Sequence, residues 1–127
     1  LVEALAEYLH ELVRKDLWGY APDERFTPEE LHKEPYRGIR PAPGYPANPE
    51  HTVKSDLFRI LRCEEIGMSL TESYAMLPTA SIAGFYFAHP DARYFTIGKI
   101  GKDQVADMAK RRHVSEEQLG HWLAPIL

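Results

Sequence analysis

A proline-rich stretch at residues 37–49 (RGIRPAPGYPANP) sets the tightest limit on what this chain can fold into. Proline fixes the backbone φ angle, removes a backbone donor and pushes the preceding residue toward extended geometry. With four prolines and two glycines, the stretch is incompatible with a helix interior or a central strand. Two interpretations remain: a passive connector between folded pieces, or a stiffened loop whose fixed backbone groups bind a ligand.

The side chains of this stretch are suited to binding. Arg40, directly before Pro41, carries a planar guanidinium that matches a carboxylate or a phosphate. Gly44 can adopt φ values closed to other residues, and Tyr45 offers a flat face and a hydroxyl. A rigid loop with one arginine and one tyrosine can hold a small zwitterion that bears a ring. On composition alone, an ordinary connector with an exposed arginine stays open as the alternative.

Helical patterns precede the proline-rich stretch. Apolar residues recur on one helix face at Val2, Leu5, Leu9, Leu12 and Val13. They predict the buried face of a helix of about four turns that ends near Trp18. Thr27 and Glu30 form a capping-box signature with Pro28 in the first turn, so a second helix should begin there. Pro35 ends that helix.

A further helix is predicted after the stretch. Asn48 followed by Pro49 repeats the start signal. The residues expected on its buried face are Val53, Leu57, Ile60 and Leu61. The helix should stop before Gly67, since glycine is common directly after a helix end.

The next third of the chain changes character. Residues 70–76, 82–88 and 94–100 are rich in β-branched and aromatic side chains, and turn-forming residues separate them. Three consecutive strands with short links predict an antiparallel meander. Successive side chains of a strand face opposite sides, so at least one of Tyr94 and Phe95 should pack within the sheet.

Two helices are expected to close the chain. Their predicted buried residues are Val105, Met108 and Ala109 in the first and Leu119, Trp122 and Leu123 in the second. Ser115 and Gln118 give the capping signature of the second helix. The order of elements predicts an α+β fold, an antiparallel β-meander flanked by helices. A DNA-binding helix-turn-helix is the alternative for the closing pair, but acidic residues such as Asp103 and Asp107 argue against it.

Composition narrows the classes of function. The 127 residues support one hydrophobic core, and a net charge of -4 argues against general nucleic-acid binding. The one cysteine, Cys63, allows no internal disulfide and is expected to be a small filler rather than a nucleophile. No apolar run reaches the length of a membrane span and no signal peptide is visible, so we expect a soluble, cytoplasmic protein.

No motif typical of metal binding or nucleophilic catalysis is present. The six histidines are scattered without a pair at ligand spacing. Ser81 lies outside a Gly-x-Ser-x-Gly elbow, and no phosphate-binding glycine motif occurs. We therefore expect neither a metal site nor a catalytic residue in this chain.

Three segments of the chain together resemble a known family. They are RGIRPAPGYPANPEHTVK, LTESYAMLPTASIAGFYFAHPDARYFTIGKIGKDQVADMAKRR and the closing HWLAPIL. In this order and spacing they are similar to the C-terminal activation domain of cobalamin-dependent methionine synthase, over essentially the whole chain. Leu1 is not a methionine, and the helical pattern is already running at Val2. We therefore expect residues 1–127 to be a partial activation domain, a single-domain fragment whose N-terminal part is missing.

The resemblance implies a function. In this family a methyl group passes from methyltetrahydrofolate to homocysteine through cobalamin, which is occasionally oxidised to inactive cob(II)alamin. The activation domain binds S-adenosylmethionine and presents its methyl group for reductive methylation of the cob(II)alamin. The implied partners are the cobalamin-binding module of the same enzyme and a flavodoxin-like electron donor. The chain itself is expected to position the methyl donor and to carry no complete active site.

The resemblance also implies which residues meet the ligand. They are Arg40, Pro41, Ala42, Gly44, Tyr45, Tyr94, Phe95 and Glu34, with Glu3 as a further candidate. Arg40 corresponds to the arginine that meets the carboxylate of S-adenosylmethionine. The segment from Pro41 to Gly44 lines the adenosyl part with its backbone, and Tyr94 and Phe95 correspond to the aromatic pair beside the ligand.

The competing interpretation is an interaction module that resembles the activation domain but has no working ligand site. Both interpretations predict the same fold. They differ in whether the Arg40 guanidinium meets a ligand carboxylate or only water, so a binding measurement separates them.

Overall fold

The computed structural model describes residues 1–127, apart from the side chain of Pro125. Its helices are α1 Val2–Leu12, α2 Pro28–Leu31, α3 Val53–Leu61, α4 Lys102–Arg112 and α5 Glu116–Leu123. Shorter helical turns are the π-helix η1 Val13–Leu17 and the 3-10 helices η2 Cys63–Ile66 and η3 Ala124–Ile126. Two strands, β1 Ser69–Leu70 and β2 Met76–Leu77, pair antiparallel, so the predicted α+β class is confirmed. Within this described chain, no helix is both long and apolar enough to cross a membrane.

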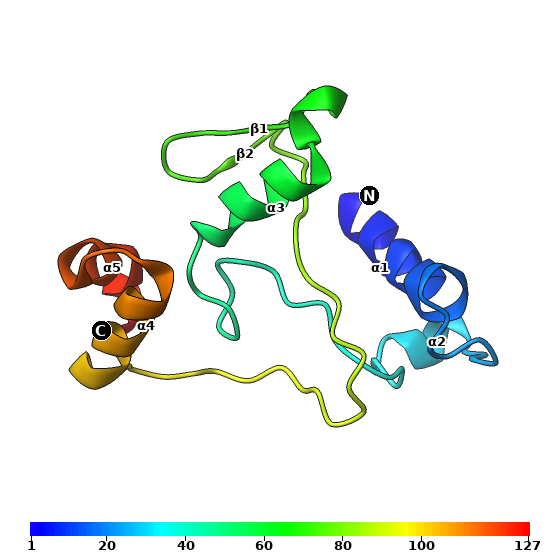
Figure 1. Ribbon diagram of the computed structural model, residues 1–127. Coiled ribbons are helices and arrows are strands. Elements are labelled where there is room, and N and C mark those ends of the chain that lie inside the picture. The colour runs from blue at the N-terminus through cyan, green and yellow to red at the C-terminus, as the bar shows by residue number, and fades with distance from the viewer.

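The elements form groups that extended chain connects (Figure 1). Helices α1 and α2 lie on one side, α4 and α5 on the opposite side, and α3 with the β1–β2 hairpin lies between them. The proline-rich stretch and the extended segment at residues 80–100 run through the middle. This arrangement places the proline-rich stretch where α1, the hairpin and the extended segment converge.

Helix α1 exposes the middle of its apolar face. Leu5 and Leu9 are 62% and 43% exposed, whereas His10 and Arg14 on the other face are completely buried. The helix itself is confirmed, and its last turn widens into η1. The predicted buried face is therefore wrong for Leu5 and Leu9 and confirmed for Val13, because periodicity locates an apolar stripe but does not show how much of it is covered.

Ionic and aromatic contacts hold the inner face of α1. The Arg14 guanidinium donates from Nε and Nη2 to the Glu24 carboxylate at 2.7–2.9 Å. The same guanidinium lies 3.9 Å from the centre of the Tyr36 ring. A buried charge is tolerated when it is paired and hydrogen-bonded. Polar side chains, rather than leucines, therefore fix α1 against the chain that leads into the proline-rich stretch.

Helix α2 begins as predicted, whereas α3 does not. Thr27 Oγ1 accepts from the Glu30 backbone at 3.3 Å, and the Glu30 carboxylate accepts from the Thr27 backbone at 2.8 Å, which confirms the capping box. Helix α3 begins at Val53 and not at Asn48. Asn48 instead closes a turn, donating its N–H to Tyr45 O at 2.8 Å, so the predicted Asn48 start is wrong.

The predicted buried face of α3 is also wrong in part, since Val53 and Leu57 are half-buried but the other two residues are not. Ile60 and Leu61 are 66% and 68% exposed, and the buried residues of the helix are Lys54 and Phe58. Lys54 Nζ donates to the Tyr74 carbonyl at 2.9 Å. The lysine is buried because its ammonium group ties α3 to the adjacent hairpin.

The first strand of the predicted three-stranded meander is a hairpin turn instead. Residues 70–76 run from β1 through a turn into β2. Inside the turn, Thr71 Oγ1 accepts from the Ala75 backbone at 3.0 Å, and Tyr74 has a φ of 62°. Such side-chain-to-backbone bonds favour a turn over a continuous strand. The single strand expected here is therefore wrong.

The second predicted strand pairs with the proline-rich stretch rather than with its neighbours. Ile39 and Phe87 exchange both backbone hydrogen bonds at 3.0 Å, and Phe85 donates to Pro41 O at 3.0 Å. The backbone pairing between the two segments ends there because Pro41 has no N–H with which to donate a second hydrogen bond. Residues 94–100 contain no strand. The meander is therefore wrong, although the β-rich composition correctly indicated extended chain.

Helices α4 and α5 form the apolar core predicted for the end of the chain. Val105, Ala109, Leu119 and Leu123 are buried, and Ile100, Met108, Val114, Trp122 and Ile126 pack around them. Ser115 Oγ caps α5 by accepting from the Gln118 backbone at 3.1 Å. Arg112 of α4 donates to the Glu50 carboxylate and, at 2.8 Å, to Thr52 Oγ1, which docks the pair on the chain before α3.

Candidate functional site

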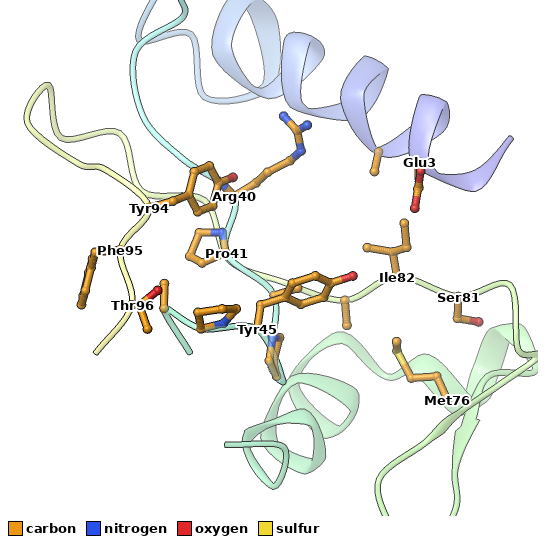
Figure 2. A pocket seen from close by; sticks show the side chains of 16 residues that line it. Glu3, Arg40, Pro41, Tyr45, Met76, Ser81, Ile82, Tyr94, Phe95 and Thr96 are labelled. Carbon is orange, nitrogen blue, oxygen red and sulfur yellow. The ribbon is translucent and has the colours of Figure 1, made fainter. Parts of the chain in front are cut away.

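One cavity collects most of the predicted ligand-binding residues. Its volume is about 710 Å³, within the range of roughly 300–1,000 Å³ that is common for small-molecule sites. Four parts of the chain meet there: α1 and residues 40–47, 76–83 and 94–96 (Figure 2). The predicted residues that line it are Arg40, Pro41, Ala42, Tyr45, Tyr94 and Phe95.

Arg40 stands in the wall of the cavity, and its side chain extends toward α1 (Figure 2). Nη2 donates to Glu7 Oε2 at 2.5 Å, while Nη1 donates to Tyr36 Oη at 2.6 Å and lies 3.0 Å from His10 Nδ1. Of the five guanidinium N–H groups, Nε–H and one on Nη2 have no partner among the described residues. Both groups can donate charge-assisted hydrogen bonds to a ligand carboxylate. Arg40 is therefore hydrogen-bonded to other side chains of the protein and still has two N–H groups available to bind a ligand.

Burial determines the protonation states of His10 and Tyr36, two of the side chains around Arg40. Desolvation, followed by the charges of Arg14 and Arg40, lowers the pKa of His10 from 6.5 to about 3. Desolvation raises the pKa of Tyr36 to about 12, although the nearby Arg40 charge opposes this. At neutral pH the imidazole is therefore uncharged and the phenol keeps its proton. Arg40 then has two neutral partners and one carboxylate partner around it.

Tyr94 and Phe95 both line the cavity. Tyr94 Oη accepts a hydrogen bond from the Arg40 backbone at 2.9 Å, which fixes this segment to the proline-rich stretch. Phe95 is 60% exposed. Because this segment forms no strand, the expectation that one of the two rings packs inside a sheet is wrong.

Gly44 does not line the cavity, but it determines the backbone conformation of the loop that does. Its φ is +97°, and its N–H donates to Asn48 O at 2.7 Å. A Cβ at this position would lie 2.1 Å from His51 Cε1. Glycine is therefore required both by the left-handed backbone and by the close approach of the imidazole.

Glu34 is separate from the cavity, whereas Glu3 lines it. Glu34 follows α2, is exposed and has a φ of 48°, and it is not among the lining residues. Its assignment as a neighbour of the ligand stays a prediction that this geometry does not support. Glu3 projects from α1 toward Ile82 (Figure 2).

Sequence reasoning missed the wall formed by Met76, Ser81 and Ile82. Their β-like composition pointed to strands and links rather than to a site. Gly84 was an available signal, because glycine inside a strand-like segment often marks a close backbone approach. A Cβ there would lie 2.9 Å from Pro41 O, so the glycine lets this segment reach the proline-rich stretch.

The cavity offers binding groups of several kinds. A guanidinium and a carboxylate stand near α1, and aromatic rings and apolar surface supply the rest. Throughout the chain as described, no group of three or more His, Cys, Asp or Glu side chains is placed to hold a metal ion. Such a cavity suits a small zwitterionic ligand with a flat ring.

Comparison with known proteins now identifies the family. Residues 1–113 match the family described as "Vitamin B12 dependent methionine synthase, activation domain". The chain belongs to this family. A solved structure, described as "Crystal Structure of the MetH Reactivation Domain bound to AdoHcy", is 54% identical to the chain with a TM-score of 0.95.

The family resemblance seen in the three quoted segments is thereby confirmed. The structural similarity covers 99% of this chain, so it also includes α5, beyond the residues matched by the family. It covers 39% of the solved relative, and this chain therefore spans well under half the length of that protein.

Proposed function

We propose that this activation-domain chain binds S-adenosylmethionine, or its demethylated form S-adenosylhomocysteine, in the cavity bordered by Arg40, Tyr45 and Tyr94. The observation that carries the proposal is this cavity, which unites most of the residues that the family resemblance assigns to the ligand. A chain 54% identical to this one is described as bound to AdoHcy, which supports the same ligand class.

The chemistry of the ligand fits the groups in the cavity. Its carboxylate matches the Nε–H and Nη2–H donors that Arg40 retains. Its purine can stack on an aromatic ring, for which Tyr45 and Phe95 are exposed. The sulfonium of S-adenosylmethionine is a cation that favours aromatic faces and a nearby carboxylate, and Glu3 supplies that carboxylate.

The proposed role of this ligand is that of methyl donor in the reductive methylation of cob(II)alamin. Cobalamin is bound mainly by another module of the parent enzyme, which makes methionine from homocysteine and 5-methyltetrahydrofolate. The residues of this chain bind and orient the donor, and the chain alone is not catalytic. The proposed partners are the cobalamin-binding module and a flavodoxin-like electron donor. That residues 1–127 form only part of the activation domain belongs to the same proposal.

Isothermal titration calorimetry with S-adenosylhomocysteine tests the proposal. Binding is measured on this chain and on a longer polypeptide that contains it and matches the whole solved relative. Arg40→Ala is expected to weaken binding about 10- to 100-fold, because it removes hydrogen bonds between two charged groups. Unchanged affinity in this variant overturns the assignment of Arg40.

Arg59→Ala is the matched control. The Arg59 guanidinium is exposed, pairs with Asp56 at 3.1 Å and is not among the residues that line the cavity. Its removal is expected to leave the affinity unchanged. If the longer polypeptide binds no S-adenosyl ligand at all, the alternative is favoured: an activation-domain-like interaction module without a working ligand site.

A further inference from the structure

Three side chains contact the Nη1 and Nη2 atoms of the Arg40 guanidinium. Glu7 and His10 come from α1, and Tyr36 comes from the chain that leads into the proline-rich stretch. None of the three is among the residues that line the cavity. Among the described residues, Glu7 Oε1 is buried without a hydrogen-bond partner, so the Glu7 carboxylate is held mainly through Arg40.

Tyr36 is buried and held by contacts on its ring. It is 7% exposed; the Arg14 guanidinium lies 3.9 Å from the centre of its ring, and the His10 ring meets it edge-to-face with centres 5.0 Å apart. Arg14 is in turn fixed by its bonds to Glu24. The Tyr36 hydroxyl therefore has a set position from which to accept the Arg40 N–H.

His10 is fixed in a similar way. It is completely buried, its ring stacks on Tyr86 with centres 5.0 Å apart, and its Nε2 lies 3.3 Å from Tyr20 Oη. If Nε2 donates to Tyr20, Nδ1 is the lone-pair nitrogen that accepts from Arg40. Both neutral acceptors of Arg40 are thus locked by contacts of their own.

We propose that Tyr36, supported by His10 and Glu7, is a positioning residue that orients Arg40 for the carboxylate of the bound ligand. The inference rests on the proposed function, because it needs a ligand with a carboxylate. A free arginine loses much side-chain entropy when it is ordered by a ligand. Holding Nη1 and one Nη2 hydrogen in advance leaves the remaining Nε–H and Nη2–H donors in a set orientation, so less entropy is lost on binding.

Tyr36→Phe is the direct test, because it removes the hydroxyl and keeps the ring that packs against Arg14 and His10. We expect the affinity for S-adenosylhomocysteine to fall about three- to tenfold, the usual worth of one hydrogen bond. Tyr8→Phe is the matched control: it makes the same chemical change on an exposed residue of α1, and no change in affinity is expected.

A second ligand separates positioning from general packing. The ligand 5′-methylthioadenosine keeps the adenosyl group and the sulfur but lacks the amino-acid carboxylate. Tyr36→Phe is expected to leave its affinity unchanged, and it should have no further effect on S-adenosylhomocysteine in an Arg40→Ala background. An equal loss for both ligands, or a loss that persists without Arg40, overturns the positioning role.

The Glu7→Gln variant tests the same proposal independently. We expect weaker binding of S-adenosylhomocysteine, with 5′-methylthioadenosine unaffected, because the charged partner that steadies Arg40 is lost. Tighter binding instead would show that Glu7 competes with the ligand carboxylate, and it would contradict the inference. If the unmodified longer polypeptide binds neither ligand, the proposed function itself has failed, which is a result distinct from any of these.

Discussion

Gly44 shows how one residue controls the geometry of the proline-rich stretch. With a φ of +97° and His51 in close contact, Gly44→Ala combines backbone strain with a steric clash. We expect it to lower the free energy of unfolding by about 2–4 kcal/mol and to weaken ligand binding. Urea denaturation measures the loss.

Gly67→Ala separates the two contributions. Gly67 also has a positive φ, +79°, but beyond its two chain neighbours no described residue lies within 4 Å of the position that an alanine methyl group would take. Only backbone strain remains there, so a loss of about 1 kcal/mol is expected. Equal losses at the two glycines would contradict the role given to His51.

His10 predicts a specific pH dependence of stability. Its pKa is lowered to about 3 in the folded chain and is near 6.5 when unfolded, so the unfolded state binds more protons between these values. The free energy of unfolding should therefore fall as the pH drops from about 6.5, by up to about 1.4 kcal/mol per pH unit. His51, whose pKa burial also lowers, acts in the same direction.

A His10→Gln variant isolates this contribution. Denaturant unfolding between pH 7 and 4.5 is expected to show a flatter pH profile for the variant, while the His51 contribution is common to both proteins. Identical slopes would mean that His10 accepts a proton without disturbing the folded state.

The residues that line the cavity were easier to predict from sequence than their contacts. Arg40 stands in a motif whose prolines and glycines mark it locally. Its partner Glu7 is 33 positions away and lies on a helix whose apolar stripe predicted the opposite face as buried. Long-range ionic pairing leaves no local pattern, so the cluster around Arg40 becomes visible only in three dimensions.

At the scale of elements, the two ends of the chain differ in what buries their helices. Leu119 of α5 is completely buried, and Leu119→Ala is expected to cost about 2–5 kcal/mol of unfolding free energy. Leu5 of α1 is 62% exposed, and Leu5→Ala should change it by less than about 0.5 kcal/mol. Comparable losses in urea denaturation would show that the outer face of α1 is covered in solution.

Apart from the start of α3, elements defined by local signals were predicted correctly, and elements that need a distant partner were not. The Thr27–Glu30 capping box and the α4–α5 core follow from neighbouring residues. The strand at residues 82–88 was expected to pair with its sequence neighbours, but Phe87 pairs with Ile39. β-propensity predicts that a segment is extended but does not predict which segment it pairs with. Pro41, which has no N–H, then ends the backbone pairing.

At the scale of the whole molecule, an ion pair between Arg112 of α4 and the buried Glu50 joins the C-terminal helices to the remainder. Glu50 is 5% exposed, and its carboxylate forms an ion pair with the Arg112 guanidinium. The same guanidinium lies 5.4 Å from the centre of the Trp122 ring. Arg112→Ala removes the charged partner of the buried Glu50 carboxylate, which keeps only the Thr52 backbone N–H, and such a loss typically costs about 3–5 kcal/mol. We expect faster amide hydrogen exchange throughout α4 and α5.

The neighbouring Arg111→Ala is the control for this ion pair. Arg111 pairs with Asp107 at 2.9 Å on an exposed surface, where such pairs contribute at most about 1 kcal/mol. Unchanged exchange in both variants would show that the helix pair docks without the Arg112–Glu50 contact.

The central claim is that the cavity between the proline-rich stretch and residues 94–96 holds an S-adenosyl ligand through Arg40. A crystal structure of the longer polypeptide with S-adenosylhomocysteine tests this most directly. We predict the ligand in this cavity, its carboxylate within hydrogen-bond distance of Arg40 Nε and Nη2, and Nη1 still bonded to Tyr36. A ligand bound elsewhere, or a carboxylate without an Arg40 contact, would contradict the account.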